Sequence, residues 1–229
     1  GNLLYQIQYL GPSVYRKTFY EYLVNPNPSV YILDRVSRTI QTDASNQIFS
    51  DMRFHYDGQL NSAPTTGDLT LTQKLTGNGS QTVDTAIQYD VYGNTLSVEA
   101  FRGYGTVNVA PSGASSTTQT LYDSETKTYR VQTIDALDQS SSSLYLYSLG
   151  VPYQVVDPNG WTTRSTFDGL GRTLSTFAPG LSQAGVHYAY PQVNANGGIA
   201  APYNVEMQIL DTFANKYRSV WGFYDGLGR

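Results

Sequence analysis

Alternation of apolar and polar residues with a period of two runs through most of this sequence. In "LLYQIQYL", Tyr5, Ile7 and Tyr9 fall on one face of an extended chain, and Gln6 and Gln8 fall on the other. This period is that of a β-strand with one buried face. Further candidate strands are "LTLTQKLTG" (69–77), "NTLSVEAFR" (94–102), "TYRVQTI" (128–134), "SLYLYSL" (143–149), "PYQVVD" (152–157), "RTLSTFA" (172–178) and "YNVEMQIL" (203–210).

Clusters of turn-forming residues separate these segments. They are "NPNPS" (25–29), "NSAPTTGD" (61–68), "GNGS" (77–80), "APSGASSTT" (110–118), "DPNG" (157–160) and "VNANGGIAAP" (193–202). No helical pattern of ordinary length lies between them, and 20 Tyr, 21 Gly and 10 Pro among 229 residues favour strands and turns. The sequence therefore predicts an all-β fold of repeated antiparallel β-hairpins with little or no helix.

Composition excludes several classes of function. The chain has no cysteine, so it has no disulfide, thiolate metal site or cysteine nucleophile, and no cofactor or metal site is predicted. Its net charge is −4 and its longest basic run is Arg16-Lys17, so nucleic acid is not expected as a partner. No apolar stretch is long enough to predict a membrane span.

An aromatic residue followed by aspartate recurs at the start of several predicted turns. The fullest copy is "TFDGLGRTLSTFAPG" (166–180), and "FYDGLGR" (223–229) repeats its first part. "QYDVYGNTLSVEAF" (88–101) is close, "LYDSETKTYRV" (121–131) lacks the glycine, "HYDGQL" (55–60) lacks glycine and arginine, and "ILDRVSRTIQTD" (32–43), with Asp34, is weaker still.

Local chemistry explains this order of residues. An aspartate carboxylate at the end of a strand can accept backbone N–H bonds from the next residues and close the turn. A glycine three positions later permits the positive φ that starts the return strand. The Arg or Asn that follows can project across the turn to the aspartate or to a neighbouring hairpin, and the aromatic supplies apolar area against the next repeat.

This pattern resembles the YD repeat of the RHS family, whose units read "YDxxGRL" and often follow "DPxG". We take 1–229 as a single β-rich YD-repeat region whose repeat signal is strongest over 87–229. The residues matching the motif are Tyr89, Asp90, Gly93 and Asn94 in one copy, Asp157, Gly160, Phe167, Asp168, Gly171 and Arg172 in the longest, and Tyr224, Asp225, Gly228 and Arg229 in the last. Phe167 replaces the usual tyrosine, and Asn94 the usual arginine.

The resemblance implies strands that spiral into a hollow shell. In bacterial RHS toxins and in the B and C components of Tc toxin complexes, such a shell encloses a toxic C-terminal polypeptide, and teneurins carry a related shell outside animal cells. It implies a structural, non-enzymatic shell segment of a secreted or surface bacterial protein that encapsulates or presents a C-terminal cargo. The expected partners are other YD-repeat segments of a longer parent chain and a toxin cargo or partner toxin component.

Two other functions remain open. An extracellular module for carbohydrate or receptor binding would use tyrosines with Trp161 or Trp221, although the alternation predicts core or inter-sheet packing for Tyr5, Tyr9 and Tyr203. A hydrolase would need clustered carboxylates, for which Asp51, Asp57 and Asp90 are candidates that no motif selects.

The sequence context of the remaining reactive residues favours structural roles for them. His55 and His187 stand beside aromatic residues in predicted strands, where packing or hydrogen bonding is the commoner role. RHS autoproteolysis occurs near a "DPxGL" junction, but Trp161 follows Gly160 here and the segment lies within the repeats. A turn is therefore the preferred interpretation of residues 157–160.

Overall fold

A computed structural model describes residues 1–77, 79–190 and 203–224 of the chain. Every regular element among these residues is a β-strand, and the pairings between strands are antiparallel, which confirms the predicted fold class. None of the described residues forms a helix able to cross a membrane. The chain divides into two compact units, residues 1–120 and 121–229, which are described separately.

The first unit is an antiparallel meander whose strands each pair with the next along the chain, from β1 to β7. β7 also pairs with β9, and the short β8 pairs back onto β6. The strands are β1 (Tyr5–Leu10), β2 (Ser13–Asn25), β3 (Ile32–Thr42), β4 (Ile48–Tyr56), β5 (Leu69–Leu75), β6 (Gln81–Tyr89), β7 (Thr95–Phe101), β8 (Gly105–Thr106) and β9 (Ser115–Tyr122).

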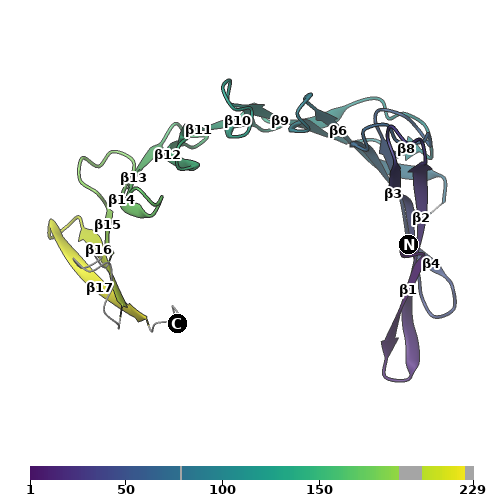
Figure 1. Ribbon diagram of the computed structural model, residues 1–229, viewed down its shortest axis with the longest axis horizontal. Coiled ribbons are helices and arrows are strands. Elements are labelled where there is room, and N and C mark those ends of the chain that lie inside the picture. Colours follow the sequence, from purple (N-terminus) through teal and green to yellow (C-terminus); the bar gives the residue numbers. More distant parts are fainter. Residues whose placement is uncertain (78, 191–202, 225–229) are drawn as a thin grey trace. The chain divides into compact units, whose positions relative to one another are not determined.

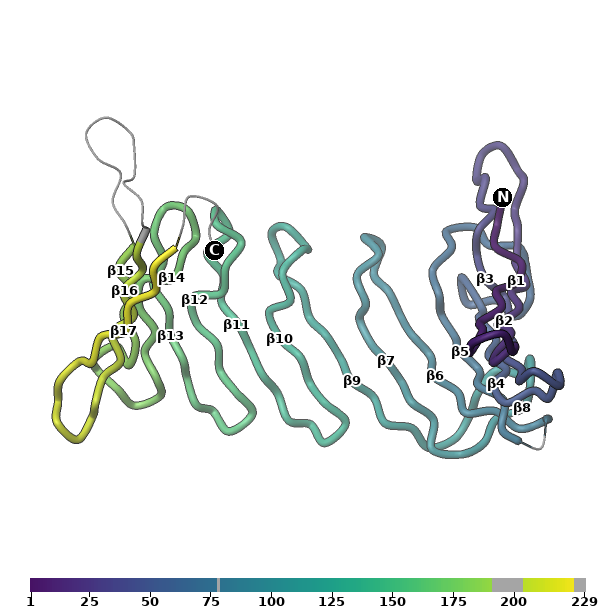
Figure 2. The backbone as a smooth tube through the Cα atoms, turned by 90° about the horizontal axis from the view of Figure 1, so that it is seen from below, coloured from purple at the N-terminus to yellow at the C-terminus, as the bar shows by residue number. Residues whose placement is uncertain are grey.

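The second unit continues as a second meander (Figure 1). Each strand again pairs with its successor, and β10 to β14 lie side by side in one layer (Figure 2). Its strands are β10 (Arg130–Ile134), β11 (Ser140–Leu146), β12 (Val151–Val156), β13 (Thr162–Phe167), β14 (Thr173–Phe177), β15 (Val186–Ala189), β16 (Tyr203–Asp211) and β17 (Lys216–Tyr224).

The strands predicted from alternation are confirmed. They correspond to β1, β5, β7, β10, β11, β12, β14 and β16. The alternation succeeds because side chains on successive residues of a strand point to opposite faces, whatever covers those faces. The predicted turn at 193–202 lies outside the described residues.

The apolar core is small in both units. Tyr56, Leu71 and Ala184 are the buried hydrophobic residues of the described chain. The alternation predicts that Tyr5 and Tyr9 pack in a core or between sheets. The core alternative is wrong for the described chain, because β1 is exposed along its whole length and these residues are 59% and 62% exposed. The side chain of Tyr203 lies outside the description. Most strands thus expose apolar side chains that nothing in the described chain covers.

Candidate functional site

The turn that joins β6 to β7 is organised by the carboxylate of Asp90. We call such a turn, in which an aspartate accepts the N–H groups of the second and fourth residues after it, an aspartate corner. The Asp90 N–H donates to the Asn94 carbonyl at 2.9 Å, and the Gly93 N–H donates to the Asp90 carbonyl at 3.1 Å. Asp90 Oδ1 accepts the N–H groups of Tyr92 and Asn94, each at 2.9 Å. A single carboxylate therefore holds the corner, and Gly93 takes the required positive φ of 85°.

The same corner recurs at β12–β13 and β13–β14. Asp157 Oδ1 accepts the N–H groups of Asn159 and Trp161, and Gly160 has φ 80°. Asp168 Oδ1 accepts those of Leu170 and Arg172, and Gly171 has φ 78°. The Asp157–Gly160 segment is a hairpin turn of the same geometry as the others.

At Asp90 and Asp168, the side chain of the residue after the corner glycine donates to the second oxygen of the carboxylate. Asn94 Nδ2 donates to Asp90 Oδ2 at 2.9 Å, and Arg172 Nε donates to Asp168 Oδ2 at 2.6 Å. The Arg172 guanidinium also lies 4.3 Å from the centre of the Tyr190 ring. Burial raises the pKa of Asp168, but the N–H groups and charge of Arg172 outweigh it and hold the pKa below its ordinary value.

Two further corners have the same hydrogen bonds but no glycine. Asp43 Oδ1 accepts the N–H groups of Ser45 and Gln47, and Asn46 takes the positive φ of 66°. Asp135 Oδ1 accepts those of Leu137 and Gln139, and Asp138 takes φ 60°. Sequence reasoning missed both because it required a glycine and an aromatic, whereas Asn and Asp also tolerate positive φ.

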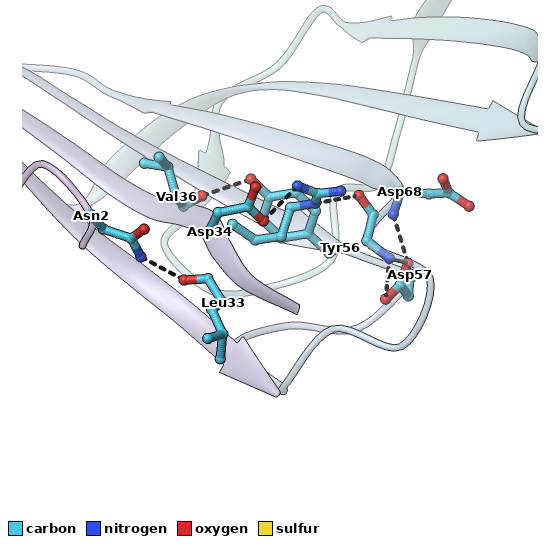
Figure 3. Close-up of polar contacts among 9 residues, drawn as sticks. Asn2, Leu33, Asp34, Val36, Tyr56, Asp57 and Asp68 are labelled. Carbon is cyan, nitrogen blue, oxygen red and sulfur yellow. Dashed lines mark hydrogen bonds and ion pairs between the residues drawn. The ribbon is translucent and has the colours of Figure 1, made fainter. Parts of the chain in front are cut away.

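The weaker copies of the motif form other structures. The Asp57 carboxylate organises the loop before β5 by accepting the N–H groups of Thr65, Thr66, Gly67 and Asp68. Figure 3 shows the contact between Asp57 and Asp68. Burial raises the pKa of Asp57, but these bonds and that of the Thr66 hydroxyl hold it well below the ordinary range.

Asp123 and Asp34 complete the set of weaker copies. Asp123 accepts N–H groups from Thr126, Thr128 and Tyr129 and so closes a longer turn. Asp34 lies within β3, paired with the side chain of Arg35, and forms no corner.

The last copy of the motif is described only in part. Tyr224 ends β17 and is exposed. Asp225, Gly228 and Arg229 lie outside the described residues.

The tyrosine before the motif aspartate donates a hydrogen bond to the backbone of a neighbouring strand in two copies. The Tyr89 hydroxyl, at the end of β6, donates to the Leu69 carbonyl at 3.1 Å. The Tyr56 hydroxyl, at the end of β4, donates to the Val36 carbonyl at 2.8 Å (Figure 3). Phe167 ends β13 at the equivalent place without a hydroxyl, so it supplies packing only.

A buried polar cluster lies across the middle strands of the first unit. Gln73 on β5 is fully buried; its Oε1 accepts from His55 Nε2 at 3.0 Å and from the Asn108 N–H at 2.9 Å. Its Nε2 faces the Asp84 carboxylate at 3.3 Å and the carbonyls of Thr106 and Val109 at 3.2 Å. The segment after β7 therefore returns to the sheet, where the pairing of β8 with β6 and the bonds of Gln73 hold it.

His55 in this cluster is buried and neutral. Burial lowers its pKa, Arg53 acts in the same direction, and the bond to Gln73 opposes them. Because Gln73 Oε1 is an acceptor, the contact assigns the proton to Nε2. His55 Nδ1 is buried and has no partner in the described chain.

Gly105 permits the close approach of the returning segment. A Cβ at this position would overlap Asp84 Oδ2 and would lie 2.8 Å from Thr82 Oγ1. Asp84 and Thr82 are buried and cannot swing aside. The glycine is therefore required by packing and not by a positive φ.

The other candidate reactive groups are not assembled into a site. Ser175 Oγ lies 2.7 Å from His187 Nδ1, but these residues are a cross-strand pair of β14 and β15, and no described carboxylate bonds to the histidine. Asp51 is paired with Arg38, whereas Asp57 and Asp90 organise separate turns. Among the described residues no three metal-ligating side chains come together.

A hollow of about 300 Å³ lies beside Trp161 in the second unit. The indole ring is 57% exposed. The end of β14 and the residues after it, from Phe177 to Leu181, also line the hollow, and Arg164 adds a polar side chain. An exposed indole beside a cation is a surface on which a flat apolar or sugar ring can stack.

Comparison with known proteins gives similarity in structure without similarity in sequence. No protein-family model and no curated protein sequence matches the chain. The solved structure of TcdB2-TccC3-Cdc42 matches 93% of this chain with a TM-score of 0.67 at 12% identity, and the chain spans 17% of that structure's chain. TcdB2-TccC3 matches 93% of this chain with a TM-score of 0.67 at 13% identity, and the chain spans 15% of that structure's chain. TcdB2-TccC3 without its hypervariable C-terminal region matches 93% of this chain with a TM-score of 0.66 at 12% identity, and the chain spans 17% of that structure's chain.

These matches confirm the fold that the motif predicts. The chain is an antiparallel β protein with a fold like that of part of the shell of Tc toxin structures. At 12–13% identity the likeness establishes the fold alone.

Proposed function

We propose that this chain is a wall segment of a toxin-type YD-repeat β-shell that encloses or presents a C-terminal polypeptide. One face of such a wall meets the cargo, and the strand edges meet further YD-repeat segments of the same parent chain or a partner toxin component. The segment has no enzymatic activity of its own. A secreted or surface location in a bacterium belongs to the same proposal.

The observation that carries the proposal is a sheet without a core of its own. Among described residues of the second unit, Ala184 is the buried hydrophobic residue, although this unit has eight strands. A domain of ordinary size buries most of its apolar side chains, because that burial offsets the entropy of ordering the chain. The exposed apolar residues on its strands include Leu144, Leu146, Val155, Leu174, Ile209, Val220 and Trp221.

A shell wall accounts for this exposure. Apolar side chains on the face of a wall are covered by whatever the shell encloses or by adjoining segments, and backbone hydrogen bonds between strands keep the wall rigid. The corners at Asp90, Asp157 and Asp168 support the role, because the hydrogen bonds of each turn lie within its own hairpin. Further hairpins can therefore be added to the sheet without changing the existing turns.

Protease protection tests the proposal. The longest native polypeptide that contains this chain is treated with a nonspecific protease. Digestion of the part C-terminal to the repeats is followed by mass spectrometry. Enclosure predicts that this part stays intact until denaturant opens the wall. If it is digested in native buffer at the rate of the same polypeptide produced alone, the encapsulating role is excluded.

Carbohydrate binding is a second candidate function, favoured by the hollow at Trp161. An exposed indole with Arg164 nearby is the kind of surface that takes a sugar ring. A glycan array with the wild-type chain and Trp161→Ala tests it, and Phe213→Ala, which changes an exposed aromatic residue outside the hollow, is the matched control. A hit lost only in Trp161→Ala supports this function, and an array without hits removes it.

A further inference from the structure

A second hollow, of about 430 Å³, lies in the first unit and is lined by β4, by the end of β5 with the turn after it, and by Arg38 of β3. Its volume is within the range of small-molecule sites. The wall combines two arginines with a carboxylate and apolar side chains. The residues that matter here are Arg38, Arg53, Asp51, Ile48, Phe49 and Leu75.

Arg38 is fully compensated within this wall. Its Nε and Nη2 donate to the two oxygens of Asp51 at 2.9 and 2.5 Å. Its Nη1 lies 3.3 Å from Glu21 Oε1. The bidentate pair fixes both side chains and leaves Arg38 no free charge for a ligand.

Arg53 has no such compensation. Arg53 lies between Arg38 on β3 and Gln73 on β5, its cross-strand neighbours. The side chain of Gln73 is already hydrogen-bonded within the buried cluster. Arg53 Nε is buried without a hydrogen-bond partner, and Arg53 makes no ion pair with any described residue. No described carboxylate neutralises the charge of Arg53, although its side chain lines the hollow, so an anionic ligand there would meet an unpaired guanidinium.

The surroundings of Arg53 select the charge and size of the ligand. Arg16 lies with its guanidinium 5.2 Å from the centre of the Phe49 ring and adds positive charge at the edge of the hollow. Asp51 in the wall disfavours a dianion such as phosphate. Ile48, Phe49 and Leu75 offer an apolar surface to the rest of the ligand.

We infer that this hollow binds a carboxylate carried on a small apolar body, with Arg53 as the partner of the carboxylate. The planar fork of a guanidinium matches the two oxygens of a carboxylate. The acid is either a free small molecule or an Asp or Glu side chain next to an aromatic residue in a polypeptide. This site is independent of the shell proposal, since it needs only the first unit.

Calorimetric titration of the whole chain tests the site with matched probes. The free-acid arm uses 3-phenylpropionate, its amide and inorganic phosphate; the polypeptide arm uses acetyl-Phe-Glu-amide and acetyl-Phe-Gln-amide. In one arm or both, the acid is expected to bind at least tenfold more tightly than its amide. The arm that binds identifies the source of the carboxylate.

Variants assign the binding to Arg53. Arg53→Met is expected to weaken binding of the acid at least tenfold, whereas Arg102→Met, an exposed arginine of the same unit, leaves it unchanged. Arg53→Met is also expected to raise the unfolding midpoint without ligand, because it removes an unpaired buried donor; Arg53→Gln is the second variant if Arg53→Met does not fold. Acids that bind no better than their amides, phosphate that binds more tightly than the acids, or full binding by a folded Arg53 variant would overturn the inference.

Discussion

At the scale of the residue, the aspartate corner is the unit of construction. One carboxylate satisfies two backbone N–H groups and leaves its second oxygen for the residue after the turn, as at Asp90 with Asn94 and at Asp168 with Arg172. Turn donors that would otherwise face water or remain unpaired are thereby held in a single geometry. The positive φ at the fourth position is the only strict backbone requirement.

The corner without glycine should be as important for stability as the corner with it. Asp135→Ala and Asp90→Ala each remove an acceptor of two N–H bonds, so each is expected to lower the free energy of unfolding by about 1–2 kcal/mol. Asp34→Ala, which changes a copy of the motif that forms no corner, is expected to stay within about 0.5 kcal/mol of wild type. Urea denaturation measures all three; equal effects at Asp34 and Asp90 would contradict the account.

The tyrosine hydroxyl before a corner should make a measurable contribution. Tyr89→Phe keeps the ring but loses the bond to the Leu69 carbonyl, so the free energy of unfolding is expected to fall by about 0.5–1.5 kcal/mol. Tyr92→Phe removes an exposed hydroxyl that has no described partner and serves as the control, with an expected change of a few tenths of a kcal/mol at most. A Tyr89→Phe variant as stable as Tyr92→Phe would show that the bond contributes nothing.

At the scale of the element, the return of the chain after β7 is the least regular part of the first unit. The carbonyls of Thr106 and Val109 and the N–H of Asn108 all bond to Gln73, so one buried side chain adds three bonds to the pairing of β8 with β6. Alternation predicts β5 because Leu69, Leu71 and Leu75 share its face. It gives no sign that Gln73 on that face is buried, because glutamine in a strand is usually exposed.

Packing of this segment depends on the absence of a side chain at Gly105. Gly105→Ala places a methyl group against the buried Asp84 carboxylate and is expected to lower the free energy of unfolding by about 1–3 kcal/mol. Gly103→Ala, where a Cβ meets nothing within 4 Å, should change it by less than about 0.5 kcal/mol. Thermal unfolding compares the pair, and a Gly105→Ala variant as stable as Gly103→Ala would show that the segment does not pack as described.

The same element should respond to pH through His55. The folded pKa of His55 is lowered, chiefly by burial, so the unfolded chain takes up its proton first as the pH falls below about 6.5. Stability contributed by neutral His55 is therefore present above pH 6.5 and is lost on acidification, by at most about 1.4 kcal/mol per pH unit.

Hydrogen exchange at the Asn108 amide measures the loss of stability that protonation of His55 causes in this segment. Its protection factor is expected to fall between pH 7.5 and 5.5 in wild type, since the amide is bonded to the Gln73 oxygen that also binds His55. In His55→Gln the fall should be much smaller. The same pH dependence in both proteins would assign the effect to another group.

At the scale of the whole molecule, much of the organisation is predictable from sequence, because it follows from interactions between residues that are close in the sequence. Strands follow from alternation, and the corners with glycine follow from turn chemistry. The corners at Asp43 and Asp135 are not predicted because no aromatic residue precedes the aspartate and because Asn46 and Asp138 replace glycine. The cluster around His55 is not predicted because its members are distant in sequence. The exposure of Tyr5 and Tyr9 escapes because alternation predicts which residues share a face but not whether another layer covers that face.

The central claim is that these strands form a wall around an enclosed polypeptide. Cryo-electron microscopy of the longest native polypeptide containing this chain tests it most directly. The account predicts a single-layer β wall in which the described strands face an interior space holding density from another part of the polypeptide or a partner. A map in which both faces of these strands are packed inside a solid domain, with no enclosed space, would contradict it.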